Sequence, residues 1–186
     1  MNVKKSLWLF LLHLELFVLG TALFILLFQT ELAKSTTVLF YRGIILLSIV
    51  TLFTFFVGVG INFALRGKTF SLSDALLSSV LIFCLNLVFF THLPVTAERS
   101  VSTFLLGYMN ENSDREISEE EMAKVLIDKY IYEHEGVRKR FDEQTVSGNI
   151  FNSGSGYRIT SRGKFVMSVY NFVTDLFRIS KKNIFP

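Results

Sequence analysis

The sequence is poor in the residues that form disulfides and metal sites. It contains one cysteine, Cys84, so no disulfide can form within these 186 residues. Its three histidines, His13, His92 and His134, are scattered without the spacing of metal ligands. The sequence also shows no pattern typical of a hydrolase triad and no phosphate-binding loop. It therefore predicts no catalytic residue, no metal site and no cofactor.

Charge is scarce in the first half of the chain. Residues 1–93 hold six of the 19 Lys and Arg residues and three of the 16 Asp and Glu residues. The formal net charge of +3 therefore belongs to this half, and residues 94–186 are balanced. A nucleic-acid-binding domain would be expected to carry a basic excess. The charge distribution argues against nucleic acid as a partner of the polar half.

Long apolar runs dominate that first half. Hydrophobic residues make up 51% of the sequence, and the mean hydropathy is +0.44. Crossing the ~30 Å hydrocarbon core of a bilayer takes about 20 apolar residues. The runs predict transmembrane helices at about 7–28, 38–65 and 75–91. The first run is too long for a cleaved signal peptide, so we expect it to be retained.

Basic residues near the predicted helix ends suggest an orientation. Lys4 and Lys5 precede the first helix, and Arg66 and Lys68 lie between the second and third. Such residues are enriched on the cytoplasmic side. The sequence therefore predicts a cytoplasmic N-terminus and an extramembrane domain, residues 94–186, on the outer side. The basic residues of that domain do not oppose this, since long domains translocate largely regardless of charge.

The polar half is predicted to be a small α+β domain, so the fold class is mainly α overall. Ser118 and Glu121 have the spacing of a capping box, in which the Glu121 carboxylate reaches back to the helix start. Two helical segments, a hairpin over about 150–159 and a last helix from Ser161 follow. This order is close to that of winged-helix proteins. We expect the apolar face of Phe165–Leu176 to close the core of this domain.

Three polar residues interrupt the apolar runs: His13, Glu15 and Asn86. A carboxylate in a membrane helix costs about 2.5–3.5 kcal/mol on insertion scales, so it usually faces protein or water. Glu15 is then a proton site or the partner of a cation in another subunit. Alternatively, it stays protonated or pairs with a polar group on a neighbouring helix. His13 does not couple with it, because residues two apart point to different sides of a helix.

A second set of residues lies at the predicted outer boundary: Arg42, His92, Arg99 and Ser100. Two fixed cations, an imidazole and a hydroxyl at headgroup depth suit a lipid phosphate, which arginine binds in a bidentate manner. The alternative is ordinary snorkelling, in which boundary arginines lie among the lipid headgroups.

A third set is basic and lies in the polar half: Arg138, Lys139 and Arg140, followed by Glu143. In a DNA-binding winged helix this segment would lie near the recognition helix and contact phosphates. The acidic neighbours and the balanced charge of the domain favour a salt-bridged helix face or a docking face for a protein partner.

Three segments together resemble a small family of bacterial membrane proteins: Val95–Ser102, Lys139–Gln144 with Ser147 and Gly148, and Tyr157–Thr160. Members of this family have three membrane helices and are encoded among genes for surface-polysaccharide or lipid-linked glycan assembly. The resemblance implies no activity. It implies a non-enzymatic accessory protein of the bacterial inner membrane, with its C-terminal domain in the periplasm.

The partners expected from this resemblance are membrane lipids, including a polyisoprenyl-phosphate-linked glycan, and a larger membrane protein or further copies of the chain. Two other functions stay open from the sequence. One is a membrane-anchored winged-helix regulator that binds DNA in the cytoplasm. The other is a small membrane enzyme that acts on a lipid-linked substrate through Glu15 or Glu98.

Overall fold

The computed structural model describes residues 3–180, and the chain divides into two compact units, residues 1–103 and 104–186. The sequence pattern placed the domain boundary after residue 93. The first unit extends further because the short helix α4 (Pro94–Arg99) follows α3 (Leu72–His92) almost without interruption and packs against it.

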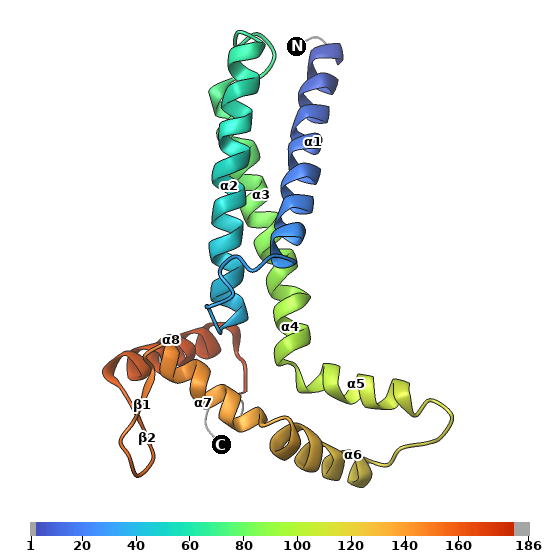
Figure 1. Ribbon diagram of the computed structural model, residues 1–186, viewed down its shortest axis with the longest axis vertical. Coiled ribbons are helices and arrows are strands. Elements are labelled where there is room, and N and C mark those ends of the chain that lie inside the picture. The colour runs from blue at the N-terminus through green and yellow to red at the C-terminus, as the bar shows by residue number, and fades with distance from the viewer. Residues whose placement is uncertain (1–2, 181–186) are drawn as a thin grey trace. The chain divides into compact units, whose positions relative to one another are not determined.

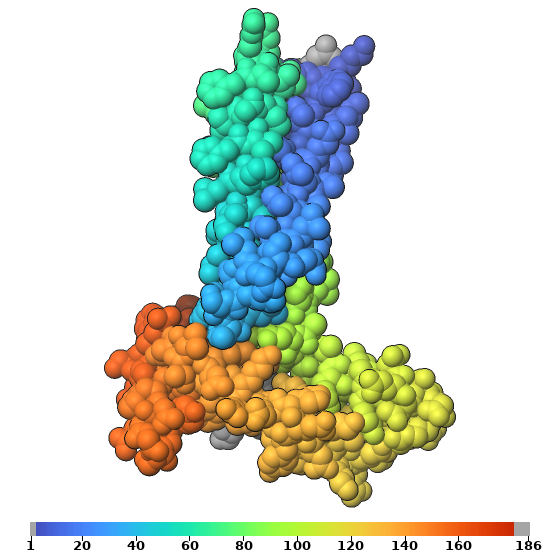
Figure 2. All heavy atoms as spheres, in the orientation of Figure 1, coloured from blue at the N-terminus to red at the C-terminus, as the bar shows by residue number. Residues whose placement is uncertain are grey.

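The first unit is a bundle of α1 (Val3–Phe28), α2 (Leu39–Ala64) and α3, in which each helix runs antiparallel to the one before it (Figure 1). The three long apolar helices of the prediction are present, and all three are long and apolar enough to cross a membrane. Many large apolar side chains of the three helices are exposed. Figure 2 shows the side chains of α1 and α2 packed along the length of the bundle. Helix α1 begins at Val3 rather than near residue 7, and α3 begins at Leu72 rather than near residue 75.

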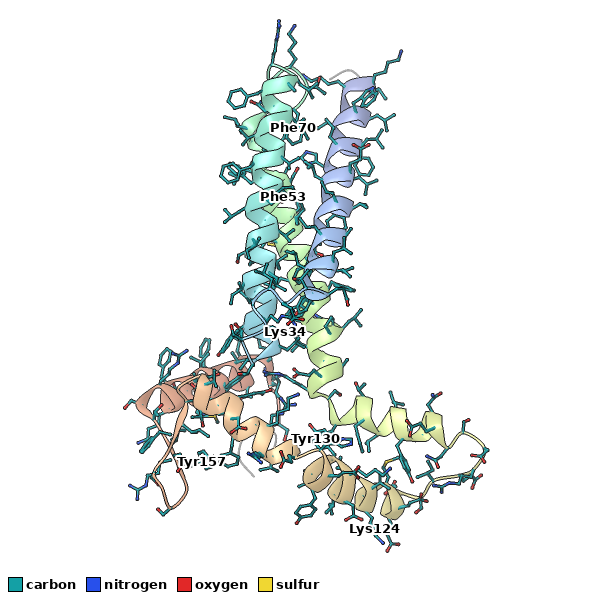
Figure 3. The ribbon with its side chains drawn as sticks, in the orientation of Figure 1. Lys34, Phe53, Phe70, Lys124, Tyr130 and Tyr157 are labelled. Atoms are coloured by element: carbon teal, nitrogen blue, oxygen red, sulfur yellow. The ribbon has the colours of Figure 1, made fainter. Side chains whose placement is uncertain are left out.

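The early start of α3 has a local cause. Ser71 Oγ accepts a hydrogen bond of 3.2 Å from the backbone N–H of Asp74, and Asp74 Oδ2 accepts one of 2.8 Å from the backbone N–H of Ser71. This capping box satisfies two amides that the first helical turn leaves without a partner. Before it, Asn62 Nδ2 donates to the carbonyl of Phe70 at 2.7 Å and closes the turn between α2 and α3. Phe70 lies near the end of the bundle that this turn forms (Figure 3).

Small residues bring the three helices together. Three buried glycines face a neighbouring helix: Gly20 lies against Ile82, Gly43 against Phe90 and Gly58 against Ala75. A Cβ at position 58 would lie 2.9 Å from the Ala75 Cβ and 3.2 Å from its Cα, so the two backbones approach without side chains between them. Membrane helices pack in this way because the lipid supplies no hydrophobic driving force between them.

Several hydroxyl groups and one amide inside the bundle bond to the helices that carry them. Side chains that donate to the carbonyl four residues earlier are those of Ser48, Thr51, Thr54, Ser79, Asn86 and Thr91. Such bonds let a polar residue face the packed interior without an unpaired donor.

The second unit is mainly helical with a two-stranded hairpin. Helix α5 (Val101–Glu111) leads into it. The elements that follow are α6 (Glu119–Val125), the π-helix η1 (Leu126–Glu133), α7 (Gly136–Val146), β1 (Ile150–Asn152), β2 (Tyr157–Ile159) and α8 (Ser161–Phe177). The strands are antiparallel, with Ile150 opposite Ile159. The predicted hairpin and last helix are therefore confirmed.

The predicted capping box at Ser118 is only half present. Ser118 Oγ accepts from the backbone N–H of Glu121 at 3.1 Å, as expected. The Glu121 carboxylate, however, accepts from Arg115 Nη1 at 2.9 Å and from the Tyr108 hydroxyl at 3.1 Å. Hydrogen bonding to the Arg115 guanidinium holds the pKa of Glu121 below its ordinary value. A charged partner six residues upstream thus displaces the local cap.

The expectation that α8 closes a core is wrong. Phe165, Phe172 and Leu176 are 67%, 66% and 62% exposed. The two strands have three residues each, so the hairpin is too small to cover a helix of 17 residues. The buried residues of α8 are Gly163 near its start, which lies against the carbonyl of Asn149, and Thr174 near its end.

We expect Gly58→Leu to lower the free energy of unfolding of the bundle by about 1–3 kcal/mol, since overpacking at this contact forces α2 and α3 apart. Gly60→Leu is the matched control, because a Cβ at position 60 meets no atom within 4 Å. Unfolding by sodium dodecyl sulfate in mixed micelles, followed by far-UV circular dichroism, measures both. Equal stability of the two variants would contradict the close approach at position 58.

Candidate functional site

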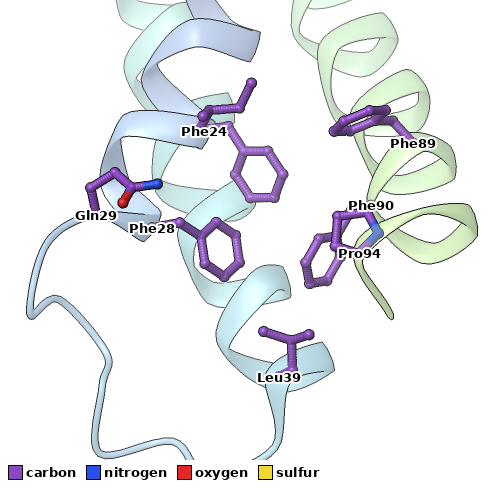
Figure 4. A pocket seen from close by; sticks show the side chains of 8 residues that line it. Phe24, Phe28, Gln29, Leu39, Phe89, Phe90 and Pro94 are labelled. Carbon is purple, nitrogen blue, oxygen red and sulfur yellow. The ribbon is translucent and has the colours of Figure 1, made fainter. Parts of the chain in front are cut away.

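A cavity of about 300 Å³ lies at the end of the bundle where α1 ends, α2 begins and α3 meets α4. Its main lining residues are Phe24, Ile25 and Phe28 from α1, Leu39 from α2, and Phe89 and Phe90 from α3 (Figure 4). Gln29 and Pro94 complete it. We call this cavity the aromatic pocket. Its lining is almost entirely hydrocarbon, which suits an apolar chain rather than a polar ligand.

Three phenylalanine rings fix the shape of the aromatic pocket. The ring of Phe24 meets those of Phe28 and Phe90 edge to face, with centroids 5.3 and 5.7 Å apart, and Phe28 lies 5.5 Å from Phe90. These separations are in the favourable range for aromatic pairs. Phe90 reaches this position because its ring occupies the space that a side chain at Gly43 would fill. The pocket therefore depends on the glycine contacts of the bundle.

Arg42 borders the aromatic pocket through Phe28. Its guanidinium lies 5.2 Å from the centre of the Phe28 ring, in a cation–π arrangement. It also donates to three backbone carbonyls at the end of α1 and in the loop after it: those of Thr30 at 2.9 Å, Phe28 at 3.3 Å and Leu32 at 3.4 Å. These bonds use Nε and Nη2, and Nη1 bonds to none of the described residues. Arg42 thus places a cation at the edge of an apolar cavity.

The other residues of the predicted boundary set bond within their own segments. His92 Nδ1 donates to the carbonyl of Val88 at 2.9 Å, and Arg99 Nε lies 3.8 Å from Glu98 Oε2. Ser100 Oγ accepts from the backbone N–H of Thr103 at 3.2 Å, at the start of α5. Of the four residues predicted to hold a lipid phosphate, Arg42 lies against the pocket, through the ring of Phe28.

His13 joins α1 to α3. Its Nδ1 shares a hydrogen bond of 2.6 Å with Ser78 Oγ, and its Nε2 lies 3.9 Å from Asp74 Oδ1. The ring of Phe70 lies against the imidazole, with centroids 5.6 Å apart. The sequence identified His13 as an intramembrane pairing residue but missed Ser78 as its partner. A serine in an apolar run does not by itself indicate a contact between helices, because most such hydroxyls bond to a carbonyl of their own helix.

The order Ser78, His13, Asp74 has the composition of a nucleophilic triad, but its geometry does not serve that chemistry. Ser78 is only 3% exposed and faces the packed interior, so a substrate carbonyl has no approach to its hydroxyl. We interpret the cluster as an interhelical contact. Among residues 3–180, no three His, Cys, Asp or Glu side chains converge as metal ligands.

The two other predicted intramembrane residues differ in their surroundings. Asn86 is buried and donates to the carbonyl of Ile82 at 2.9 Å. Glu15 is exposed on α1 and has no partner among the described residues. It therefore does not couple with His13, which faces α3.

The basic segment of the second unit is paired with acids of its own. Arg138 Nη1 lies 3.0 Å from Glu135 Oε1, and Arg140 Nη1 lies 2.8 Å from Glu143 Oε2, with Glu143 buried. Burial acts to lower the pKa of Arg140, but its bonds with Tyr130 and Glu143 outweigh that effect and raise the pKa. The segment is a salt-bridged helix face.

A second cavity, of about 570 Å³, lies at the opposite end of the bundle. Its lining includes Lys4, Lys5 and Trp8 from α1. Lysine and tryptophan at this depth are common anchors at a membrane boundary.

Comparison with protein-family models, with curated proteins and with solved structures finds no match to this chain.

We expect Arg42→Ala to destabilise the bundle by about 1–3 kcal/mol, because it leaves the carbonyls at the end of α1 without a charged donor. Arg42→Lys should destabilise the bundle by a smaller amount, since an ammonium group keeps the charge but cannot span three carbonyls. Lys34→Ala is the control in the same loop, where an exposed pair with Glu31 contributes little. Thermal unfolding in detergent measures all three. Equal effects of Arg42→Ala and Lys34→Ala would contradict this role of Arg42.

Proposed function

We propose that this chain is a non-enzymatic accessory protein of the bacterial inner membrane that takes part in cell-envelope glycan or glycolipid assembly. In this role it binds a polyisoprenyl-phosphate-linked glycan and docks on a larger membrane protein. The observation that carries the proposal is the adjacency of the aromatic pocket and Arg42: an apolar cavity and a fixed cation meet at one end of a membrane bundle.

The chemistry of such a lipid matches both parts of the site. A segment of its hydrocarbon chain would lie against Phe24, Phe28 and Phe90, where only apolar surface is offered. Its phosphate would lie at the boundary, within reach of Nη1 of Arg42. Binding of a phosphate at that position is also favoured by charge-assisted hydrogen bonding, which is stronger in a region of reduced dielectric constant.

The orientation of the chain belongs to the same proposal. With Lys4, Lys5, Arg66 and Lys68 in the cytoplasm, the aromatic pocket opens at the periplasmic end of the bundle. The second unit is then periplasmic. Its order of helix, helix, hairpin and helix supports a winged-helix-like arrangement, and the face with Arg138, Lys139, Arg140 and Glu143 is its docking surface for a protein partner.

Lipid binding tests the pocket. Ile25→Trp should fill the cavity and weaken binding of undecaprenyl phosphate to the detergent-solubilised protein at least fivefold, as measured by native mass spectrometry. Leu26→Trp is the matched control, since Leu26 is 61% exposed and does not line the pocket. Phosphatidylglycerol serves as the competing lipid. Equal binding by the two variants, or no preference for undecaprenyl phosphate, would exclude the pocket as the site.

Cysteine labelling tests the orientation. In a Cys84→Ser background, a cysteine introduced in place of Ser153, in the hairpin turn, should react with a membrane-impermeant maleimide in intact spheroplasts. The reason is that the second unit lies outside the cytoplasm in this topology. Labelling of Ser153→Cys only after permeabilisation would show that the second unit is cytoplasmic. The aromatic pocket would then open at the cytoplasmic end of the bundle.

A further inference from the structure

Glu15 lies at the middle of a membrane-spanning helix. It is the thirteenth of the 26 residues of α1, so it is about 18 Å along the axis from Val3 at ~1.5 Å per residue. A helix of this length spans the ~30 Å hydrocarbon core with a few residues to spare at each end. The carboxyl group is therefore close to the bilayer centre, where water is scarcest.

The Glu15 side chain faces away from the bundle. Its neighbours His13 and Leu16 face inward, His13 toward Ser78 and Leu16 into the core. The residues above and below it on the outer surface of α1 are all exposed: Leu11, Val18 and Leu19, at 37%, 57% and 46%. A single carboxyl group thus lies in an otherwise apolar, lipid-facing surface, which we call the Glu15 face.

Three other polar residues of the spans have their partners inside the bundle. His13 bonds to Ser78, Asn62 to the carbonyl of Phe70, and Asn86 to the carbonyl of Ile82. Within residues 3–180, Glu15 has no such partner. A carboxylate exposed to hydrocarbon is unfavourable unless a cation or a hydrogen-bond donor reaches it. The group that satisfies Glu15 must therefore come from outside the bundle.

We propose that the Glu15 face docks a transmembrane helix of another protein that carries a lysine or arginine at the bilayer centre. The inference rests on the proposed role as a partner protein and names the chemistry of the partner. The proposal is based on charge complementarity. An ion pair at this depth is strong because the surrounding dielectric constant is low, and its formation also shields the Glu15 carboxylate from the lipid.

A second copy of this chain does not offer the required cation. The described spans carry Lys4 and Lys5 at the start of α1 and Arg42 at the start of α2, and none lies near the centre. Two copies meeting through this face would place one Glu15 beside another. The face also lacks the pair of small residues, four apart, that close-packed helix dimers use: Ala22 is flanked by Val18 and Leu26, and Gly20 is turned inward against Ile82.

Trp8 provides a probe of this face without modification of the protein. It is the one tryptophan of the sequence, is 63% exposed, and lies seven residues before Glu15 on the same side of α1. The full-length protein in phosphatidylcholine vesicles is titrated with dansyl-labelled, tryptophan-free leucine helices that carry lysine, leucine or glutamate at the centre. Energy transfer from Trp8 to the dansyl group reports binding.

We expect the lysine-centred helix to bind the wild-type protein at least tenfold more tightly than it binds Glu15→Leu or Glu15→Gln at pH 7.5. The leucine-centred helix should bind all three proteins alike. Both substitutions lie on the lipid-facing surface, so the fold is preserved, and circular dichroism verifies this. A matched control combines Glu15→Leu with Leu14→Glu, which keeps a carboxylate at the same depth but turns it by about 100° around the helix. It should bind as weakly as Glu15→Leu.

Three outcomes would overturn the proposal. Tighter binding of the glutamate-centred helix than of the lysine-centred one would assign the face to a second copy of the chain. Equal binding of the lysine-centred helix to wild type and Glu15→Leu would leave Glu15 in contact with lipid alone. Binding of the lysine-centred helix to the control with Leu14→Glu as tightly as to wild type would show that the side of α1 on which the carboxylate lies does not matter. None of these results affects undecaprenyl phosphate binding at the aromatic pocket, so the two proposals fail separately.

Discussion

Hydrocarbon offers no hydrogen bonds, and this constraint governs the first unit of the chain. Every polar group that enters the membrane must find its partner in protein. The hydroxyls of α2 and α3 bond to their own helices, Asn62 closes a turn, and His13 reaches across to Ser78. Arg42 satisfies the carbonyls that α1 leaves unpaired at its end. Against this background a lipid-facing carboxyl group is an exception that calls for an external partner.

The constraint also explains which parts of the fold were predictable. Three spans follow from length and hydropathy alone, because a helix is the structure that satisfies the backbone of an isolated apolar segment. The start of α3 was missed, although Ser71-Leu-Ser-Asp74 has the spacing of a capping box. The exposed face of α8 was mispredicted because periodicity identifies an apolar face and does not show what covers it.

The aromatic pocket was beyond prediction for a different reason. The sequence has 20 phenylalanines, and no pattern distinguishes the few that converge. Their convergence depends on how closely α2 and α3 approach, which is set by Gly43 and Gly58. Arg42 was predicted at the boundary from its position in the sequence. Its bonds to carbonyls in the preceding loop required the path of that loop, which sequence spacing does not give.

The contact between Gly43 and Phe90 has a consequence for how this sequence can change over evolutionary time. The ring of Phe90 fills the volume above position 43, so the sizes of the two residues are inversely related. A larger residue at position 43 is compatible with the bundle only together with a smaller one at position 90. Such a change would remove one wall of the aromatic pocket. In descendants that retain the pocket, both positions should therefore keep a glycine and a phenylalanine.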